Sequence, residues 1–228
     1  MTQKILVLLS GGIDSTTVLY DCLQKSCKIE AVSFNYGAKH NRQELTCAEY
    51  HTQKHSIRHH IIPLDFINEF FTSDLLLSGN DVPDGHYEES SMKKTVVPFR
   101  NGIMLSIAAG LAESVQASEL VIAAHSGDHA IYPDCRESFM APMANAISKG
   151  TYAEIILTRP FIDMKKSEIV ALGTSLQVDY SHTWSCYKGR EIHCGSCGTC
   201  VERREAFMVA GLTDPTKYKS TDVLPPKP

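Results

Sequence analysis

An apolar run of five residues, from Ile5 to Leu9, is followed at once by the sequence SGGIDSTT at residues 10–17. Such a short apolar run predicts a buried strand, and the polar stretch behind it predicts a tight turn into a helix. Two adjacent glycines let the backbone adopt positive φ and approach a ligand closely. Because the free N–H groups at the start of a helix bind anions, the pattern indicates a phosphate-binding loop. The alternative is a plain strand-to-helix turn capped by Ser10 or Asp14.

Strand-like and helix-like stretches alternate through the rest of the chain. This alternation is typical of βαβ units, which build a parallel sheet with helices on both faces. Asn101 is expected to cap the third helix and Gly173 to end the last one. The irregular stretch 65–99 is long enough to be a functional loop. The predicted strands are residues 4–9, 29–34, 57–64, 120–124 and 153–158, and the predicted helices are residues 14–25, 40–54, 101–113, 136–148 and 165–172.

The loop lacks the features of two common phosphate-binding motifs. It has no Gly-Lys-Ser/Thr ending, so it is not a Walker loop, and it has no G-x-G-x-x-G, which argues against a dinucleotide-binding fold. Residues 10–15, Ser-Gly-Gly-Ile-Asp-Ser, instead resemble the loop of the ATP pyrophosphatase (PP-loop) superfamily. That resemblance implies a Rossmann-like α/β fold. It also implies cleavage of ATP between its α and β phosphates, transfer of AMP to a substrate oxygen and release of pyrophosphate.

Four of the eight cysteines form the run C-x7-C-x2-C-x2-C near the C-terminal end of the sequence. Thiolates two residues apart can face one ion, and four of them saturate tetrahedral zinc without leaving a position for water. We therefore expect a structural zinc site, with an iron–sulfur cluster, a thiol–disulfide pair and unbound cysteines as the alternatives. The expected ligands are Cys186, Cys194, Cys197 and Cys200.

The cysteine run also suggests how the chain is divided. We expect residues 1–180 to form a nucleotide-binding α/β domain and residues 181–228 to form a zinc-binding segment packed on that domain. The zinc site would clip this segment to the body of the protein. It would also orient Arg203 and Arg204 on the helix that follows.

The charge balance narrows the class of partner. The chain has 228 residues, a net charge of −4 at pH 7 and a pI of about 6.2, so no basic field gathers nucleic acid. No apolar stretch approaches the roughly 18 residues of a membrane span, and the first apolar run is too short for a secretory signal. We therefore expect a cytoplasmic protein that acts on small molecules, with its cysteines reduced or bound to metal.

Further short motifs narrow the resemblance to one family within the superfamily. Taken with the loop and the four cysteines, they are similar over nearly the whole chain to the 7-cyano-7-deazaguanine synthases of queuosine biosynthesis. Many members of that family carry Gly or Asn where this chain has Phe99. The matching stretches are Tyr36-Gly37 with His40, Val97-Pro98-Phe99-Arg100-Asn101, Tyr132-Pro133-Asp134-Cys135-Arg136, Lys166-Ser167-Glu168-Ile169 and Trp184-Ser185-Cys186-Tyr187.

The resemblance implies an ATP-dependent ligase. In this family the carboxylate of 7-carboxy-7-deazaguanine is adenylated, and ammonia displaces AMP to give the amide. A second ATP activates the amide oxygen, and loss of AMP leaves the nitrile. The loop is expected to bind ATP with Mg²⁺, and the cysteine run predicts one structural Zn²⁺ per chain. No glutaminase domain fits in this length, so free ammonia is the expected nitrogen source. The resemblance favours a homodimer.

The loop and the end of the second strand carry the expected nucleotide site. The loop would hold the β and γ phosphates, with Mg²⁺ neutralising their charge, and the strand end would border the adenine and ribose. Asp14 would repel a bare phosphate, so we expect it to act as a helix cap or a partner for Mg²⁺. The expected nucleotide-binding residues are Ser10, Gly11, Gly12, Asp14, Ser15, Thr16, Phe34, Tyr36 and Gly37.

Two cations join Asp14 as expected catalytic residues. Arg100 precedes an apolar helix, where its guanidinium suits a carboxylate or phosphate, and the alternative is a surface arginine. Lys166 opens a helix after the fifth strand, where the resemblance implies a lysine against phosphate. Cys135 is interpreted as a packed or substrate-lining thiol, because adenylation needs no thiol nucleophile.

The remaining expected contacts are to the substrate. The Asp134 carboxylate matches the N–H donors on the guanine-like edge of the substrate. His125 and His129 lie four residues apart, which hints at a metal site, but no third ligand accompanies them. The expected substrate-binding residues are Arg100, Asn101, Asp128, His129, Asp134 and Arg136.

Three other functions remain open at this point. One is a tRNA thiolase or lysidine-type synthetase, although the acidic balance argues against an RNA substrate. Another is a zinc-ribbon module that regulates by contacting nucleic acid, which leaves residues 10–15 unexplained. A third is an amidotransferase that stops at the amide.

Overall fold

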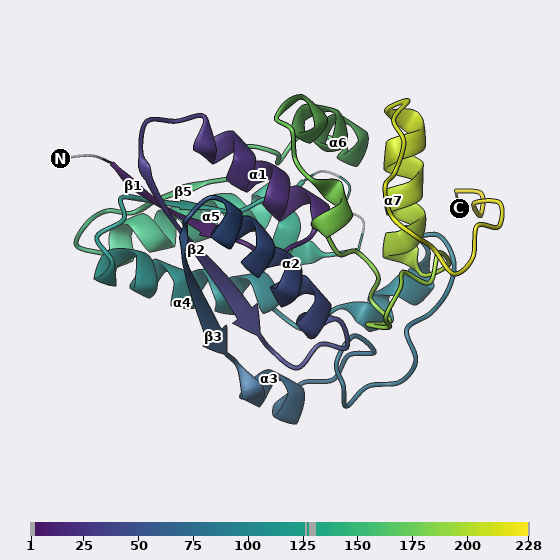
Figure 1. Cartoon of the computed structure of the whole chain (residues 1–228). Coiled ribbons are helices and arrows are strands. Elements are labelled where there is room, and N and C mark those ends of the chain that lie inside the picture. The colour runs from purple at the N-terminus through teal and green to yellow at the C-terminus, as the bar shows by residue number, and fades with distance from the viewer. Residues whose placement is uncertain (1–2, 126, 128–130, 228) are drawn as a thin grey trace.

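In the computed structural model, which describes residues 3–125, 127 and 131–227, five parallel strands form one sheet in the order β3-β2-β1-β4-β5 (Figure 1). The chain builds outward from β1 to β3 and then crosses to the other side of β1 for β4 and β5. Ligands of such sheets bind where the order reverses, beyond the carboxyl ends of the central strands. The strands are β1 (Lys4–Leu8), β2 (Lys28–Asn35), β3 (Arg58–Pro63), β4 (Glu119–Val121) and β5 (Ile156–Thr158).

Helices cover both faces of the sheet, as expected for a doubly wound α/β fold (Figure 1). Along β1 the side chains alternate, so that Ile5 and Val7 pack under one set of helices and Leu6 packs under the other. On the first face lie α1 (Ile13–Leu23), α2 (Asn41–Lys54), α6 (Lys166–Ser175) and α7 (Gly198–Val209), and on the second lie α4 (Arg100–Ser114) and α5 (Glu137–Gly150). The short helices are α3 (Asp65–Phe70), η1 (Ser90–Thr95), η3 (Pro133–Cys135) and η4 (Tyr180–His182).

Within Ser90–Ser114, which includes η1 and α4, an 18-residue window has a mean hydropathy of 1.3 and passes a length-and-composition test for a membrane span. Within α4, Leu105 and Ala108 are fully buried, and they belong to the core beneath the sheet. Core helices pass the same test. These contacts therefore account for the apolar sequence of α4.

The start of α4 differs from the prediction. Asn101 does not cap the helix, because α4 begins one residue earlier and its N-cap is Phe99. The backbone N–H of Asn101 instead donates to Asp134 Oδ2 at 2.8 Å, which satisfies one of the unpaired donors at the helix start. Phe99 has a φ of 53° in the left-handed region. That conformation favours Gly or Asn over an aromatic residue.

The end of α6 also differs from the prediction. Gly173 lies inside α6 rather than after it, and the helix continues to Ser175. A Cβ atom on Gly173 would lie 1.9 Å from the Tyr180 hydroxyl oxygen and 2.8 Å from Thr17 Oγ1. This glycine therefore permits close packing of α6 against α1 and η4, and does not end a helix.

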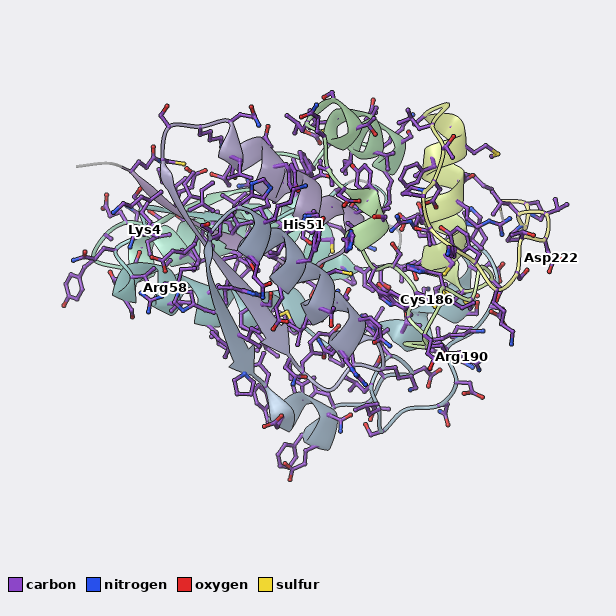
Figure 2. The ribbon with its side chains drawn as sticks, viewed as in Figure 1. Lys4, His51, Arg58, Cys186, Arg190 and Asp222 are labelled. Atoms are coloured by element: carbon purple, nitrogen blue, oxygen red, sulfur yellow. The ribbon has the colours of Figure 1, made fainter. Side chains whose placement is uncertain are left out.

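The last part of the chain folds back against the first. The N–H of Trp184 donates to the carbonyl of Gly11 at 2.9 Å, so the segment after η4 contacts the glycine loop directly. Figure 2 shows Cys186 and Arg190 beside the lower end of α7, with Asp222 in the tail that returns along the same helix. Arg204 on α7 donates to the Asp222 carbonyl at 2.6 Å. The division at residue 180 stays a prediction.

Candidate active site

A cleft opens beyond the carboxyl ends of β1, β2 and β4, at the place where the strand order reverses. Segments that are far apart in sequence meet there: the glycine loop, the first turns of α2, α4, α6 and α7, and part of the irregular stretch 65–99. Met92 and Thr95 bring that stretch to the cleft wall. The expected site residues that line the cleft are Ser10, Gly12, Asp14, Ser15, Phe34, Tyr36, Arg100, Asn101 and Lys166, together with the thiol-bearing Cys135.

The glycine loop wraps around one hydroxyl group. The backbone N–H groups of Ser10 and Gly11 donate to Ser15 Oγ at 3.1 and 3.2 Å, and the N–H of Gly12 donates to Ser10 Oγ at 3.3 Å. Gly12 is the N-cap of α1, and no side chain caps the helix. Neither Ser10 nor Asp14 therefore caps α1 through its side chain, as the alternative expected. The positive end of α1 faces the cleft, where it can attract an anion.

Gly11 has a structural role. Its φ is +88°, and an added Cβ would lie 2.1 Å from the Glu44 carbonyl oxygen on α2. The loop can therefore lie this close to α2 only with glycine at this position. Thr16 also points away from the ligand side, since it is fully buried and is not among the described residues that line the cleft.

A lysine sits between two carboxylates beside the loop. Lys166 Nζ lies 2.9 Å from Asp14 Oδ2 and 2.9 Å from Glu202 Oε2, and His125 Nε2 is 3.5 Å from Lys166 Nζ. Burial acts to raise the pKa of Asp14, but the charges of Lys166 and His125 outweigh it and hold that pKa below its ordinary value. The result is a fixed cation at the mouth of the glycine loop.

A second group of cleft-lining residues holds an arginine among phenol rings. Arg100 donates from its guanidinium to the Tyr36 hydroxyl at 3.2 Å, and its central carbon lies 5.8 Å and 6.0 Å from the ring centres of Tyr36 and Tyr132. The hydroxyl oxygens of Tyr132 and Tyr187 are 3.2 Å apart. A planar aromatic ligand with a carboxylate would find both stacking surfaces and a bidentate donor here.

The turn between β2 and α2 is held by a residue that sequence reasoning missed. Asn41 Oδ1 accepts from the N–H groups of Tyr36 and Ala38 at 3.0 Å each, and Asn41 Nδ2 donates to the Phe34 carbonyl at 3.0 Å. These three bonds place Tyr36 against Arg100. Gly37 lies in the same turn with a φ of +75°, where a Cβ would be 2.5 Å from Asn68 Cβ.

Helix α2 also brings two titratable groups into the cleft that the sequence analysis did not assign. Glu44 Oε2 lies 3.4 Å from His40 Nε2, and the His40 ring stacks on Tyr187 with centroids 4.9 Å apart. Burial raises the pKa of Glu44 to about 8, against the opposing charge of Arg100. Burial and the charge of Arg100 lower the pKa of His40 to about 3. The spacing of four residues on a predicted helix could have marked this pair.

Some expected site residues lie elsewhere. Asp134 is buried, and its carboxylate binds the Asn101 N–H at the start of α4. Asn101 also donates to Cys135 Sγ at 3.2 Å. Arg136 is exposed just before α5 and, with Asp134 and Gly37, is not among the described cleft-lining residues. The expected contacts of residues 128 and 129 lie outside the described residues.

The four cysteines of the C-x7-C-x2-C-x2-C run meet in a buried cluster. Their sulfur atoms all lie within 4.8 Å of one another, and Cys194 Sγ is 3.8 Å from Cys200 Sγ. Tetrahedral zinc with Zn–S bonds of about 2.3 Å separates its thiolates by about 3.8 Å. Backbone N–H groups of Ser196 and Cys197 donate to Cys194 Sγ at 3.4 and 3.2 Å, which favours the thiolate form. The cluster therefore fits a single tetrahedral metal ion.

The fold and the loop define the class of protein. The structure resembles the U34-tRNA thiolase NcsA from Methanococcus maripaludis with its [4Fe-4S] cluster, with a TM-score of 0.52 over 97% of this chain and 76% of that one. It also resembles the NMN synthetase from Francisella tularensis, with a TM-score of 0.54 over 93% and 79%. Both are 12% identical in sequence, so the similarity is one of fold. The chain has the PP-loop α/β fold, as the sequence predicted.

The sequence comparisons then identify the family. The family described as queuosine biosynthesis protein QueC matches residues 4–211, and the chain belongs to it. A protein of Porphyromonas gingivalis named 7-cyano-7-deazaguanine synthase is 54% identical over 94% of this chain and 96% of its own. Proteins of the same name from Desulfotalea psychrophila and Methanoregula boonei are 50% and 46% identical, over 96% and 95% of this chain and 99% and 100% of theirs. The chain is an enzyme of this family.

Proposed function

We propose that this enzyme converts 7-carboxy-7-deazaguanine and ammonia to 7-cyano-7-deazaguanine, with two ATP converted to two AMP and two pyrophosphate. The observation that carries the proposal is one cleft with two differently built ends, in a chain 54% identical to a protein named for this product. One end has the features of a phosphate site. The other has the features of a site for an aromatic carboxylate.

The phosphate end comprises the glycine loop, the start of α1 and Lys166. Uncapped N–H groups and the helix dipole attract the phosphates of ATP, and the cation of Lys166 stabilises the negative charge that develops on departing pyrophosphate. Asp14 Oδ1 is buried and has no hydrogen-bond partner within the described residues, so it is an oxygen ligand suited to Mg²⁺. When bound, Mg²⁺ would neutralise phosphate charge there.

The carboxylate end comprises Arg100 and the phenol rings around it. The guanidinium would bind the carboxylate of the substrate and aim one of its oxygens at the α phosphorus. Tyr36, Tyr132 and Tyr187 would pack against the planar deazaguanine ring. Carboxylate and amide oxygens are poor leaving groups, and AMP is a good one. Two adenylations in succession therefore allow nitrogen to replace both oxygens.

The metal of the cysteine cluster is proposed to be zinc, one ion per chain. Four thiolates close its coordination, so no water is activated and the ion is structural. It would fix the segment that carries Trp184 against the loop and the start of α7, which carries Glu202. We further propose free ammonia as the nitrogen source, a cytoplasmic location and a homodimer.

The test is mass spectrometry of the products that purified protein forms from ATP, Mg²⁺, ammonium and 7-carboxy-7-deazaguanine. The expected result is the nitrile with about two AMP per product. An amide with one AMP would instead identify an amide-forming enzyme. Absence of AMP would overturn the proposal and direct the search toward RNA substrates.

A matched pair of variants connects the activity to the cleft. Lys166→Met removes the cation that contacts Asp14 and Glu202, and it should abolish ATP–pyrophosphate exchange that depends on the carboxylate substrate. Lys165→Met removes the neighbouring exposed lysine and should leave exchange unchanged. Equal exchange in both variants would show that the phosphates bind elsewhere.

A further inference from the structure

The conversion of a carboxylate to a nitrile requires a group that takes protons from nitrogen. In the second half of the proposed reaction, the amide oxygen displaces pyrophosphate from ATP and becomes bonded to AMP. One N–H proton is then lost as the C=N bond forms. The second N–H proton is lost as the C–O bond breaks, which forms the C≡N bond and releases AMP. Both protons must pass to a base, and a positioned base speeds such transfers by about 10²–10⁴-fold.

The described residues that line the cleft include three carboxyl groups, those of Asp14, Glu44 and Glu202. The first and third each lie 2.9 Å from Lys166 Nζ, so they share one lysine in an ion-paired cluster. A carboxylate held in an ion pair is a weaker base. Glu44 differs, because no hydrogen bond that the structure describes involves its carboxyl group. The ring of His40 is its titratable neighbour on this side, with Nε2 at 3.4 Å from Glu44 Oε2.

The position of Glu44 is fixed from several sides. Its side chain is 14% exposed, in a residue that lines the cleft. Helix α2 packs against the glycine loop at the Glu44 carbonyl, so the backbone that carries this carboxyl group is held beside the phosphate end. The titratable or charged groups that face it are His40, the N-cap of α2, with Cys47 on α2, Arg100 on α4 and Tyr36 after β2.

We propose that Glu44 is the proton acceptor of the nitrogen steps, taking N–H protons first from ammonium as the amide forms and then from the adenylated amide. The inference rests on the proposed function. Arg100 would hold the carbon that reacts, and Glu44 would face the nitrogen attached to it. No proton is taken from the substrate in the adenylation of the carboxylate, so that step would not use Glu44.

The electrostatics of the site agree with this role. Burial raises the pKa of Glu44 to about 8, so the group exchanges protons near neutral pH and is a stronger base than an ordinary carboxylate. His40 has its pKa lowered to about 3, and it therefore stays neutral and does not pair with Glu44 as a cation. Glu44 accepts a proton only in its ionised form. The nitrogen step should therefore accelerate as pH rises through about 8 and then level off.

The experiment separates the nitrogen step from adenylation. Glu44→Gln and the wild type are given the amide, 7-carboxamide-7-deazaguanine, with ATP and Mg²⁺, and nitrile is measured from pH 6 to pH 10. No ammonium is present, so its own titration does not enter. Carboxylate-dependent ATP–pyrophosphate exchange is measured in parallel. Glu49→Gln, the same change on an exposed position of α2, is the control.

The expected result is a loss of about 10²–10⁴-fold in nitrile formation by Glu44→Gln, with exchange unchanged. The rise in rate near pH 8 should disappear in this variant and return, at a reduced rate, in Glu44→Asp. Nitrile formation by Glu44→Gln at the wild-type rate would overturn the inference. Loss of both exchange and nitrile formation in Glu44→Gln would also overturn it. Failure of the wild type itself to exchange would overturn the proposed function instead.

Discussion

Replacement of Arg203 by Met should destabilise the protein more than any other single arginine change on α7. Arg203 is fully buried, and its guanidinium binds groups from two other segments, η4 with the residues just after it and the tail. It donates to the Tyr180 carbonyl at 2.9 Å, to Thr183 Oγ1 at 2.8 Å and to Asp214 Oδ1 at 3.2 Å. These bonds connect α7 to η4 and to the tail, and they support the segment in which the Trp184 N–H contacts the glycine loop.

The magnitude follows from what the substitution leaves behind. Met fills most of the space but donates no hydrogen bond. Asp214, with a side chain only 11% exposed, then loses its cationic partner, although it keeps the hydrogen bonds from the N–H of Thr216 and the hydroxyl of Tyr218. Removal of one member of a buried ion pair costs about 3–5 kcal/mol. For a chain of this length each kcal/mol lowers Tm by about 2–4 °C, so Tm should fall by roughly 6–20 °C.

The assay is thermal unfolding of the metal-loaded protein followed by circular dichroism. Arg204→Met is the matched control. Arg204 is the next residue of α7. Within the described residues it donates to the carbonyl groups of Gly195 and Asp222, and its guanidinium lies 5.7 Å from the ring centre of Tyr218, so we expect a loss of about 1 kcal/mol. The double variant Arg203→Met/Asp214→Asn should recover about 1–3 kcal/mol relative to Arg203→Met, because the unpaired charge is gone. Equal Tm values for the two single arginine variants would refute the reasoning.

Three further predictions test other parts of the structure. Gly173→Ala should lower the free energy of unfolding by about 1–3 kcal/mol, because the added methyl group overpacks the contact with Tyr180. Gly110 lies in open space on α4, so Gly110→Ala should raise the free energy of unfolding by about 1 kcal/mol. Urea titrations in which both variants change the free energy of unfolding in the same direction would contradict this. Elemental analysis should find one zinc ion per chain and none in Cys194→Ser, whose Tm should fall; iron in place of zinc would refute the assignment. Burial acts to raise the pKa of Asp179, but hydrogen bonds from three neighbouring side chains lower it to about 2. The ionised Asp179 carboxyl group therefore stabilises the fold above its ordinary pKa of 3.8, and this stabilisation is lost as the pH falls toward 2. The melting temperatures of wild type and Asp179→Asn should therefore converge as the pH falls through that range, and diverging values would contradict this.

Much of the fold could be predicted from local sequence patterns. A strand or a helix is marked by the spacing of apolar residues within a dozen positions, and alternating strands and helices imply a parallel sheet. The predicted strands and helices are all present, with β4 and β5 shorter than expected at three residues each. Some helix ends differ from the prediction, because the residue at which a helix begins or ends depends on partners far along the chain. Asn101 lies inside the first turn of α4 because Asp134, from a separate segment, satisfies its N–H.

The sequence by itself determined the features whose chemistry is contained in a short stretch. The glycine loop needs a strand, two glycines and a helix start, and the metal site needs four thiols at short spacing, so both could be read from adjacent residues. The tertiary structure alone decided which side chains share the cleft. It turned Gly11 toward α2, buried Thr16, and placed Glu202 and Lys166 together from positions 36 residues apart. It also placed the Glu44 carboxyl group in the cleft, where no hydrogen bond among the described residues involves it, because pairwise distances and burial arise only when segments distant in sequence pack against one another.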